Sequence, residues 1–171
     1  MRQATEQHGA LAAAVCFAAV LAAGCTPQDR AFPTRAAGTP APAGLDAAEL
    51  PPVTLPNLSN VESSIRTQLE EEYAALESAI EDPNTTPVDL SHAYGKTGHL
   101  LMATGHREAA EVCYLHAWAL VPDERRWPYY LGHVSRLGGA FARSATFFAE
   151  ALALGPHDVP TLLWLGEVHL A

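Results

Sequence analysis

Residues 91–124 read SHAYGKTGHLLMATGHREAAEVCYLHAWALVPDE, and residues 125–158 read RRWPYYLGHVSRLGGAFARSATFFAEALALGPHD. The two stretches repeat each other with a period of 34 residues, and the same glycine recurs at Gly166 within VPTLLWLGEVHLA, residues 159–171. A period of this length predicts a row of similar units, each too small to bury its own apolar face. The matching pairs are Gly98 with Gly132, Gly105 with Gly139, Tyr114 with Phe148, Ala117 with Ala151, Leu120 with Leu154, and Pro122 with Pro156.

Within each period, a glycine and a proline stand at fixed positions that favour a tight turn and a helix end. Gly105 and Gly139 mark the turns, because a positive φ is cheap only for glycine. Pro122 and Pro156 end the second helix of each unit, since proline cannot continue the hydrogen-bond ladder. Close approach of the paired helices is expected at the small residues Gly98, Gly132, Ala110 and Ala117.

We call a set of residues at equivalent positions of the successive units a column. The columns of this sequence resemble those of the tetratricopeptide repeat, and the resemblance covers residues 91–171. It implies an all-α fold, a helix-turn-helix solenoid over residues 88–171 with about two and a half repeats, 91–124, 125–158 and a partial 159–171. In that family the first helices of successive repeats line a concave surface that binds peptides. Carried over column by column, the groove would present His92, His99, Arg126, Tyr129, His133 and Arg136, with Gly95, Met102, Pro160, Leu163 and Glu167 beside them.

This surface predicts a cationic, aromatic patch within an acidic protein. Arg126 and Arg136 would hold an acidic segment or a C-terminal carboxylate. If His99 and His133 contact the ligand, its affinity should vary between about pH 5 and pH 8. The chaperone-tail clamp of the family is not implied, because its lysine or arginine and asparagine columns hold other residues here. The alternative is a solvated groove with scattered histidines.

A helix is also predicted ahead of the repeats, at residues 59–82. Ser59 and Glu62 form a capping box, and the Asp82–Pro83 pair stops the helix. Its outer face is rich in glutamate and is expected to face water. The apolar residues recur every three or four positions, which makes the helix amphipathic; they are Val61, Ile65, Leu69, Tyr73, Leu76 and Ile80.

The N-terminus predicts an export signal over residues 1–24. No charge interrupts Gly9–Gly24, and the ending LAAGC resembles the lipobox of bacterial lipoproteins, which implies cleavage before Cys25 and lipidation of its thiol. The implied location is the bacterial cell envelope, on the periplasmic side of the outer membrane; the alternative is an ordinary secretory signal and a secreted or periplasmic protein. Residues 25–58 then form a Pro/Ala-rich linker, expected to be disordered, extended and unpacked, with seven of the thirteen prolines in residues 26–58.

Cys113 and His116 stand one helical turn apart, as a nucleophile and its base could. One period later they align with Phe147 and Glu150, which predicts a buried small hydrophobe at Cys113 and a solvent-facing side chain at His116. No orienting third group accompanies the pair, so no catalytic residue and no enzyme activity are predicted. Metal and cofactor motifs are also missing from the sequence, although His92, His99 and His106 are spaced by seven.

The net charge of −9 argues against nucleic acid as a partner. The predicted function is an envelope-anchored scaffold that binds partner proteins or peptides and reaches the membrane through its lipid. Two alternatives stay open: a recruiting module of a longer protein whose catalytic or electron-transfer domain lies beyond Ala171, and a structural self-assembly module. The apolar stretch TLLWLGEVHLA at residues 161–171 has no polar cap, so the chain is expected to continue or to find a partner there.

Overall fold

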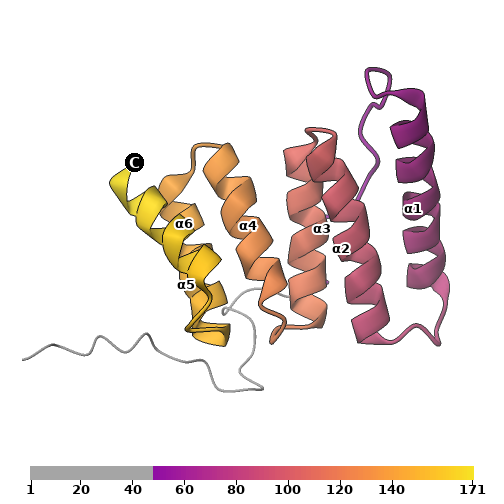
Figure 1. Ribbon diagram of the computed structural model, residues 1–171. Helices are drawn as coiled ribbons and strands as arrows, with labels where there is room; N and C mark the ends of the chain where they lie inside the picture. The colour runs from indigo at the N-terminus through magenta and orange to yellow at the C-terminus, as the bar shows by residue number, and fades with distance from the viewer. Residues whose placement is uncertain (1–47) are drawn as a thin grey trace, which may run out of the picture. The chain divides into compact units, whose positions relative to one another are not determined.

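The computed structural model describes residues 48–171, which form helices and no strand in that range. The all-α expectation is therefore confirmed for this part of the chain. The predicted signal peptide, the predicted lipidation site Cys25 and residues 26–47 of the predicted linker lie outside the described residues. The helices are α1 (Ser63–Glu81), α2 (Pro87–Ala103), α3 (Arg107–Leu120), α4 (Arg126–Leu137), α5 (Phe141–Leu154) and α6 (Val159–Leu170) (Figure 1). Among these six helices, none has the length and apolar character needed to cross a membrane.

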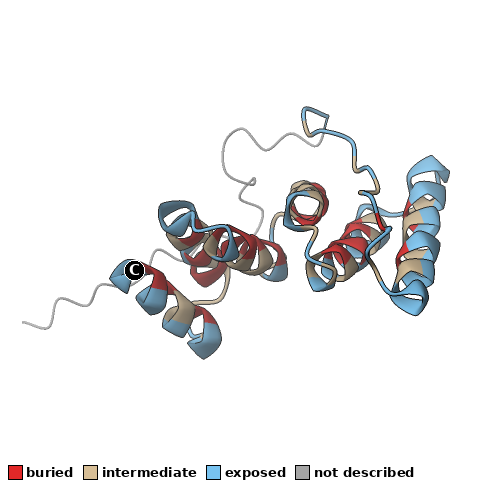
Figure 2. Cartoon of the chain, turned by 90° about the horizontal axis from the view of Figure 1, so that it is seen from above, coloured by how far each residue is buried: buried red, intermediate tan, exposed pale blue. Residues whose placement is uncertain are grey.

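Each helix packs against its neighbour in the sequence, from α1 on α2 through to α5 on α6. The buried residues form two apolar clusters. The larger joins α1 to α4 and includes Leu69, Leu101, Trp118 and Leu131. The smaller joins α5 to α6 around Phe148, Leu152, Leu165 and Val168. Figure 2 shows that the buried residues lie on the faces of the helices that are turned toward their neighbours.

The two predicted turns are confirmed. Gly105 has a φ of +81° and Gly139 has a φ of +76°. At each turn the residue after the glycine donates its amide hydrogen to a carbonyl five positions earlier, at 2.8 Å and 2.9 Å. These bonds satisfy carbonyls that the helix end leaves unpaired. The second helices, α3 and α5, each end two residues before their prolines, Pro122 and Pro156, as expected.

The predicted close approach at the first glycine column is also confirmed. A Cβ atom added at Gly98 would lie 2.8 Å from Cε1 of Tyr114, and one added at Gly132 would lie 2.5 Å from Cε1 of Phe148. Both aromatic rings are buried against the bare backbone. The same pair of contacts, 34 residues apart, therefore joins α2 to α3 and α4 to α5.

Helix α1 begins at Ser63, four residues after the predicted start at Ser59. Glu62 caps it by accepting the amide hydrogens of Ser64 (3.1 Å) and Ile65 (3.4 Å). The hydrogen bond from the Ser64 hydroxyl is the main reason that the pKa of Glu62 falls to about 2. The capping box predicted for Ser59 was wrong, because the carboxylate itself reaches the first free amides.

The apolar stripe of α1 is buried only in its middle. Leu69 and Leu76 are fully buried in the larger cluster. Ile65 and Ile80, near the two ends, are exposed. The helix ends at Glu81, ahead of Pro83, as predicted.

Residues 51–58, which we call the strap, correct the prediction of an unpacked linker. The Tyr73 hydroxyl donates to the carbonyl of Val53 at 3.0 Å, and Nε2 of His116 lies 2.9 Å from the carbonyl of Pro51. Leu58 is buried in the larger cluster. Apolar side chains between the prolines explain the difference, because burying them offsets the entropy lost by an already restricted segment.

Candidate functional site

A cleft of ≈ 520 Å³ opens between α1, α2 and α4. Three residues of the predicted groove, His92, His99 and Arg126, line it together. The remaining lining residues are Gln68 and Glu72 of α1, Gly95, Lys96 and Leu100 of α2, and Trp127 of α4. The structure thus gathers half of the predicted groove residues around one hollow.

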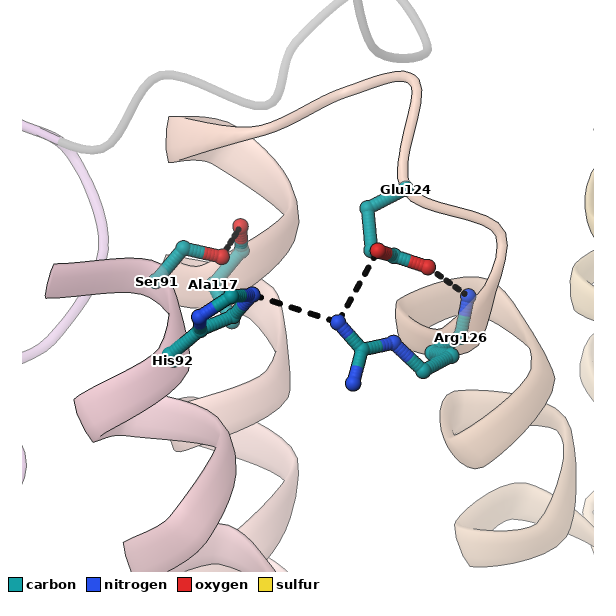
Figure 3. Close-up of polar contacts among 5 residues, drawn as sticks. All are labelled: Ser91, His92, Ala117, Glu124 and Arg126. Atoms are coloured by element: carbon teal, nitrogen blue, oxygen red, sulfur yellow. Dashed lines mark hydrogen bonds and ion pairs between the residues drawn. The ribbon is translucent and has the colours of Figure 1, made fainter. Parts of the chain in front are cut away.

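Arg126 lies at the rim of this cleft, held by two neighbours (Figure 3). Its Nη2 lies 2.9 Å from Oε2 of Glu124 and 3.2 Å from Nε2 of His92. The guanidinium carbon also stands 5.1 Å from the ring centroid of Trp127, within cation–π range. The hydrogen bond from Arg126 lowers the pKa of the Glu124 carboxyl and, in return, raises the pKa of the guanidinium. Arg126 is therefore a fixed, partly exposed cation whose Nη2 makes both polar contacts.

Two contacts fix the position of α2, the helix that contributes most residues to the cleft. The Ser91 hydroxyl donates to the carbonyl of Ala117 at 2.9 Å and ties the start of α2 to α3 (Figure 3). Farther along α2, a Cβ atom at Gly95 would lie 2.3 Å from Cη2 of Trp127. The indole of Trp127 is buried, and its Nε1 has no hydrogen-bond partner within the described chain. Only glycine allows this ring to lie directly against the α2 backbone.

His99 stands on the same face of α2, with its ring held by aromatic neighbours. Its Nδ1 contacts the carbonyl of Gly95. The ring meets Tyr130 edge-on at 4.5 Å between centroids, and Tyr114 at 5.6 Å. The residue as a whole is exposed, so part of the imidazole is open to a ligand.

The charges around the cleft are nearly balanced. Nζ of Lys96 lies 3.9 Å from Oε2 of Glu72, in an exposed pair of the kind that contributes little stability. Glu124 offsets Arg126 in the same way. The predicted cationic patch was therefore wrong in its electrostatics, because each cation at this cleft has a carboxylate beside it.

The other half of the predicted groove lies against the chain's own α6. Nη1 of Arg136 lies 3.3 Å from Oε1 of Glu167, and its guanidinium carbon is 4.3 Å from the ring centroid of Trp164. Tyr129 contacts His133 edge-on, at 4.6 Å between centroids. None of Arg136, Tyr129 and His133 lines the cleft.

His133 repeats the setting of His99 one period later, but with more burial. Its ring meets Phe148 edge-on at 5.2 Å and Trp164 at 4.9 Å between centroids. Burial, and then the positive charge of Arg136, lower the pKa of His133 from 6.5 to about 4. The imidazole is thus neutral at about pH 5 and above, so the predicted affinity change between about pH 5 and pH 8 does not apply to this histidine.

Several residues of the cleft escaped the sequence reading. Lys96 directly follows Gly95, a predicted groove position. The equivalent position one period later holds Tyr130. Trp127 directly follows the predicted groove residue Arg126. Its large aromatic side chain could have indicated that it lines the cleft. Gln68 and Glu72 lie on α1, which has no partner in the 34-residue period, so no column could point to them.

The flanking groove positions are scattered as well. Gly95 is covered by Trp127, and Met102 packs partly buried against the larger cluster. Pro160 and Leu163 are exposed on α6. Of these four residues, only Gly95 lines the cleft.

Cys113 is fully buried, and burial raises the pKa of its thiol to about 12. A thiol nucleophile needs the opposite shift. His116 is buried too, and its predicted exposure was wrong. Its ring stacks on Tyr94, with 4.7 Å between centroids and planes 7° apart, while Nε2 contacts the Pro51 carbonyl. The equivalent position one period later holds Glu150, which gives no sign that His116 is buried, because the strap covers only the first unit.

Residues 48–171 contain no group of three or more histidine, cysteine, aspartate or glutamate side chains placed to hold a metal ion. The histidines on α2 belong instead to hydrogen-bond and ring contacts within the protein, as described above for His92 and His99.

Comparison of the chain with known protein families and with curated proteins finds no match.

Proposed function

We propose that this chain is an envelope-anchored scaffold whose tetratricopeptide-type helices bind a peptide of another protein in the cleft between α1, α2 and α4. The recurrence of the same turn and the same glycine–aromatic contact after 34 residues supports the repeat assignment. The lipobox-like ending at Cys25 supports a lipid anchor and a location on the periplasmic side of the outer membrane. The proposed role is binding by a rigid surface, with no reaction of its own.

The gathering of His92, His99, Lys96 and Arg126 around one hollow carries this proposal. Arg126 uses Nη2 for both internal contacts, which leaves the Nη1 donors for a carboxylate of the ligand. The exposed Lys96 ammonium, which also lines the cleft, adds a second donor. A short segment with one terminal or side-chain carboxylate fits this arrangement better than a strongly acidic one, because Glu72 and Glu124 already balance the charge.

Removal of Arg126 should weaken such binding strongly. The probe is a fluorescent library of octapeptides with free C-terminal carboxylates, compared with the same library amidated, and read by anisotropy. Arg126→Ala is expected to weaken binding of the selected free-carboxylate peptide about tenfold, because a hydrogen bond to a charged group contributes ~1.5–3 kcal/mol. Arg107→Ala, at an exposed arginine on α3, is the matched control and should bind as the unaltered chain does.

Equal binding by Arg126→Ala, or a preference for the amidated library, would refute the carboxylate contact. Arg136→Ala separates the two halves of the predicted groove. It should leave peptide affinity within about twofold, because Arg136 is engaged by Glu167 and Trp164 away from the cleft.

Self-assembly through α6 is a second candidate function. Val159, Leu163 and Leu170 are 61 %, 69 % and 91 % exposed, a high fraction for large apolar side chains on one helix. A cluster of this kind marks an interaction surface. The peptide cleft does not include any of these residues.

Sedimentation equilibrium tests this alternative. If α6 assembles the chain, Leu163→Glu should abolish concentration-dependent association, because it would bury an unpaired carboxylate in the interface. Leu137→Glu, at an exposed leucine on α4, is the control and should leave association intact. A chain that stays monomeric at every concentration excludes this function.

A further inference from the structure

The strap lies on a different surface from the cleft, between α1 and α3. Figure 2 shows the described chain entering from the side of α3 and crossing toward α1 before it turns into that helix. The printed sequence of the strap is PPVTLPNL, residues 51–58. Prolines at three of its eight positions hold the backbone extended, so little entropy is lost when it docks.

Side chains of α1 and α3 contact the backbone carbonyls of the strap. Tyr73 of α1 donates its hydroxyl hydrogen to the Val53 carbonyl (3.0 Å), and Nε2 of His116 on α3 lies 2.9 Å from the Pro51 carbonyl. Proline lacks an amide hydrogen but keeps its carbonyl, so proline at these positions leaves no backbone donor unpaired. The two contacts therefore accept an extended backbone that contains prolines, and the prolines favour binding by restricting that backbone beforehand.

Apolar side chains supply the other half of the recognition. Val53 and Leu55, two residues apart, pack partly buried against the larger cluster, and Leu58 is buried within it. The ring of Tyr94, buried beneath, stacks on the imidazole of His116 and keeps its Nε2 directed at the strap. Donors to carbonyls beside pockets for apolar side chains are the usual way to bind an extended peptide.

The strap fills its surface only in part. A hollow of ≈ 380 Å³ remains between it and the start of α3. The strap side of this hollow is formed by Pro51, Pro52, Val53, Thr54 and Pro56, and the helix side by His106, Glu108, Ala109 and Val112. A segment held by two side-chain hydrogen bonds over an incompletely filled surface is one that a better-fitting sequence can displace.

We propose that the surface formed by Tyr73, His116 and the adjoining apolar cluster is a second peptide-binding site, which takes an extended proline-containing segment of a partner protein and is occupied by the chain's own strap in the partner's absence. The occupant is defined by the strap itself. It is an extended segment restricted by prolines, with backbone carbonyls that accept from Tyr73 and His116 and with apolar residues two positions apart. The partner binds by replacing the strap. The site then couples partner binding to release of the segment that leads back toward Cys25.

Competition by the strap sets the expected size of the effect. A segment joined to its site by a short linker has an effective concentration on the order of 1 mM. For a free peptide with a dissociation constant of about 100 μM, an occupied site therefore weakens binding on the order of tenfold. Opening the strap should remove this competition.

The test uses the full chain and a fluorescent peptide of strap sequence, ELPPVTLPNL (residues 49–58). In the open variant, Val53→Asp with Leu55→Asp, the strap should leave its apolar contacts and the labelled peptide should bind about tenfold more tightly than to the unaltered chain. Adding Tyr73→Phe to the open variant should weaken peptide binding about fivefold, the loss of one hydrogen bond. A peptide carrying the same two aspartates is the control and should not bind.

Equal peptide affinity for the unaltered chain and the open variant would overturn the proposal, as would an absence of binding to an open variant with an unchanged circular dichroism spectrum. If the double variant does not fold, Leu55→Ala is the milder opening and should still strengthen peptide binding severalfold over the unaltered chain. Exchange of straps between two unaltered copies, seen as association that the open variant loses, would assign the site to a second copy and overturn the assignment to a separate partner. Arg126→Ala should change none of these results, so failure here is distinguishable from failure of the cleft.

Discussion

Replacing Gly132 by alanine is expected to lower the free energy of unfolding by about 2–3 kcal/mol, the cost of overpacking a filled core. The added Cβ would lie 2.5 Å from Cε1 and 2.6 Å from Cδ1 of Phe148, a ring that is fully buried and has nowhere to move. Helix α4 and helix α5 would have to separate. Urea unfolding followed by circular dichroism measures the change.

Gly166 supplies a control in the same column of the repeat. A Cβ atom at Gly166 meets nothing within 4 Å, so Gly166→Ala should not clash. It should raise the unfolding free energy by up to about 1 kcal/mol, because alanine is the better helix former. Phe148→Leu offers a second check: combined with Gly132→Ala, it should cost less than the sum of the two single changes. Equal effects of Gly132→Ala and Gly166→Ala would show that helix propensity, rather than the aromatic contact, decides this column.

The second large effect concerns pH. The pKa of His133 is lowered from 6.5 to about 4 in the folded protein, so the unfolded chain binds more protons between these values. Stability is therefore fully present above the unfolded pKa and is lost as the pH falls toward the folded pKa. Between about pH 7.5 and pH 5, His133 should contribute a loss of about 2 kcal/mol in unfolding free energy.

The measurement is urea unfolding at a series of pH values, compared between the unaltered chain and His133→Gln. The variant should be less stable at about pH 7.5 through lost ring contacts, yet should show a shallower decline toward about pH 5. His157→Gln, at an exposed histidine, should keep the original slope. Parallel curves for the unaltered chain and His133→Gln would mean that His133 takes up its proton without opening its aromatic surroundings.

The turns and the helix ends could be predicted because each depends on a single residue type, glycine or proline. Gly105 and Gly139 adopt a positive φ that other residues rarely take, and Pro122 and Pro156 follow the helix ends that they were expected to impose. The 34-residue period also predicted that helices would approach closely at Gly98 and Gly132, and the structure shows that an aromatic ring lies against each of them. The start of α1 could not be predicted in the same way. Both Ser59 and Glu62 are residue types that can cap a helix, and only the three-dimensional structure shows that Glu62 does so.

The candidate site was predictable only in part. Columns of the repeat pointed to His92, His99 and Arg126, which do lie together. The columns assigned Arg136 the same role as an open cation, although Glu167 and Trp164 engage it. A column states which positions are equivalent along a repeat, but it carries no information on which neighbour satisfies a charge.

The sequence by itself determined the all-α class, the turns and the close approach of helices at Gly98 and Gly132, because these follow from backbone sterics and from short spacings along the chain. Only the tertiary structure decided that the strap docks, that His116 is buried beneath it, and that Arg126 and Arg136 each have a carboxylate partner. These features join residues as much as 65 positions apart. Their free energies depend on burial and distance between elements, which no local pattern in the sequence records.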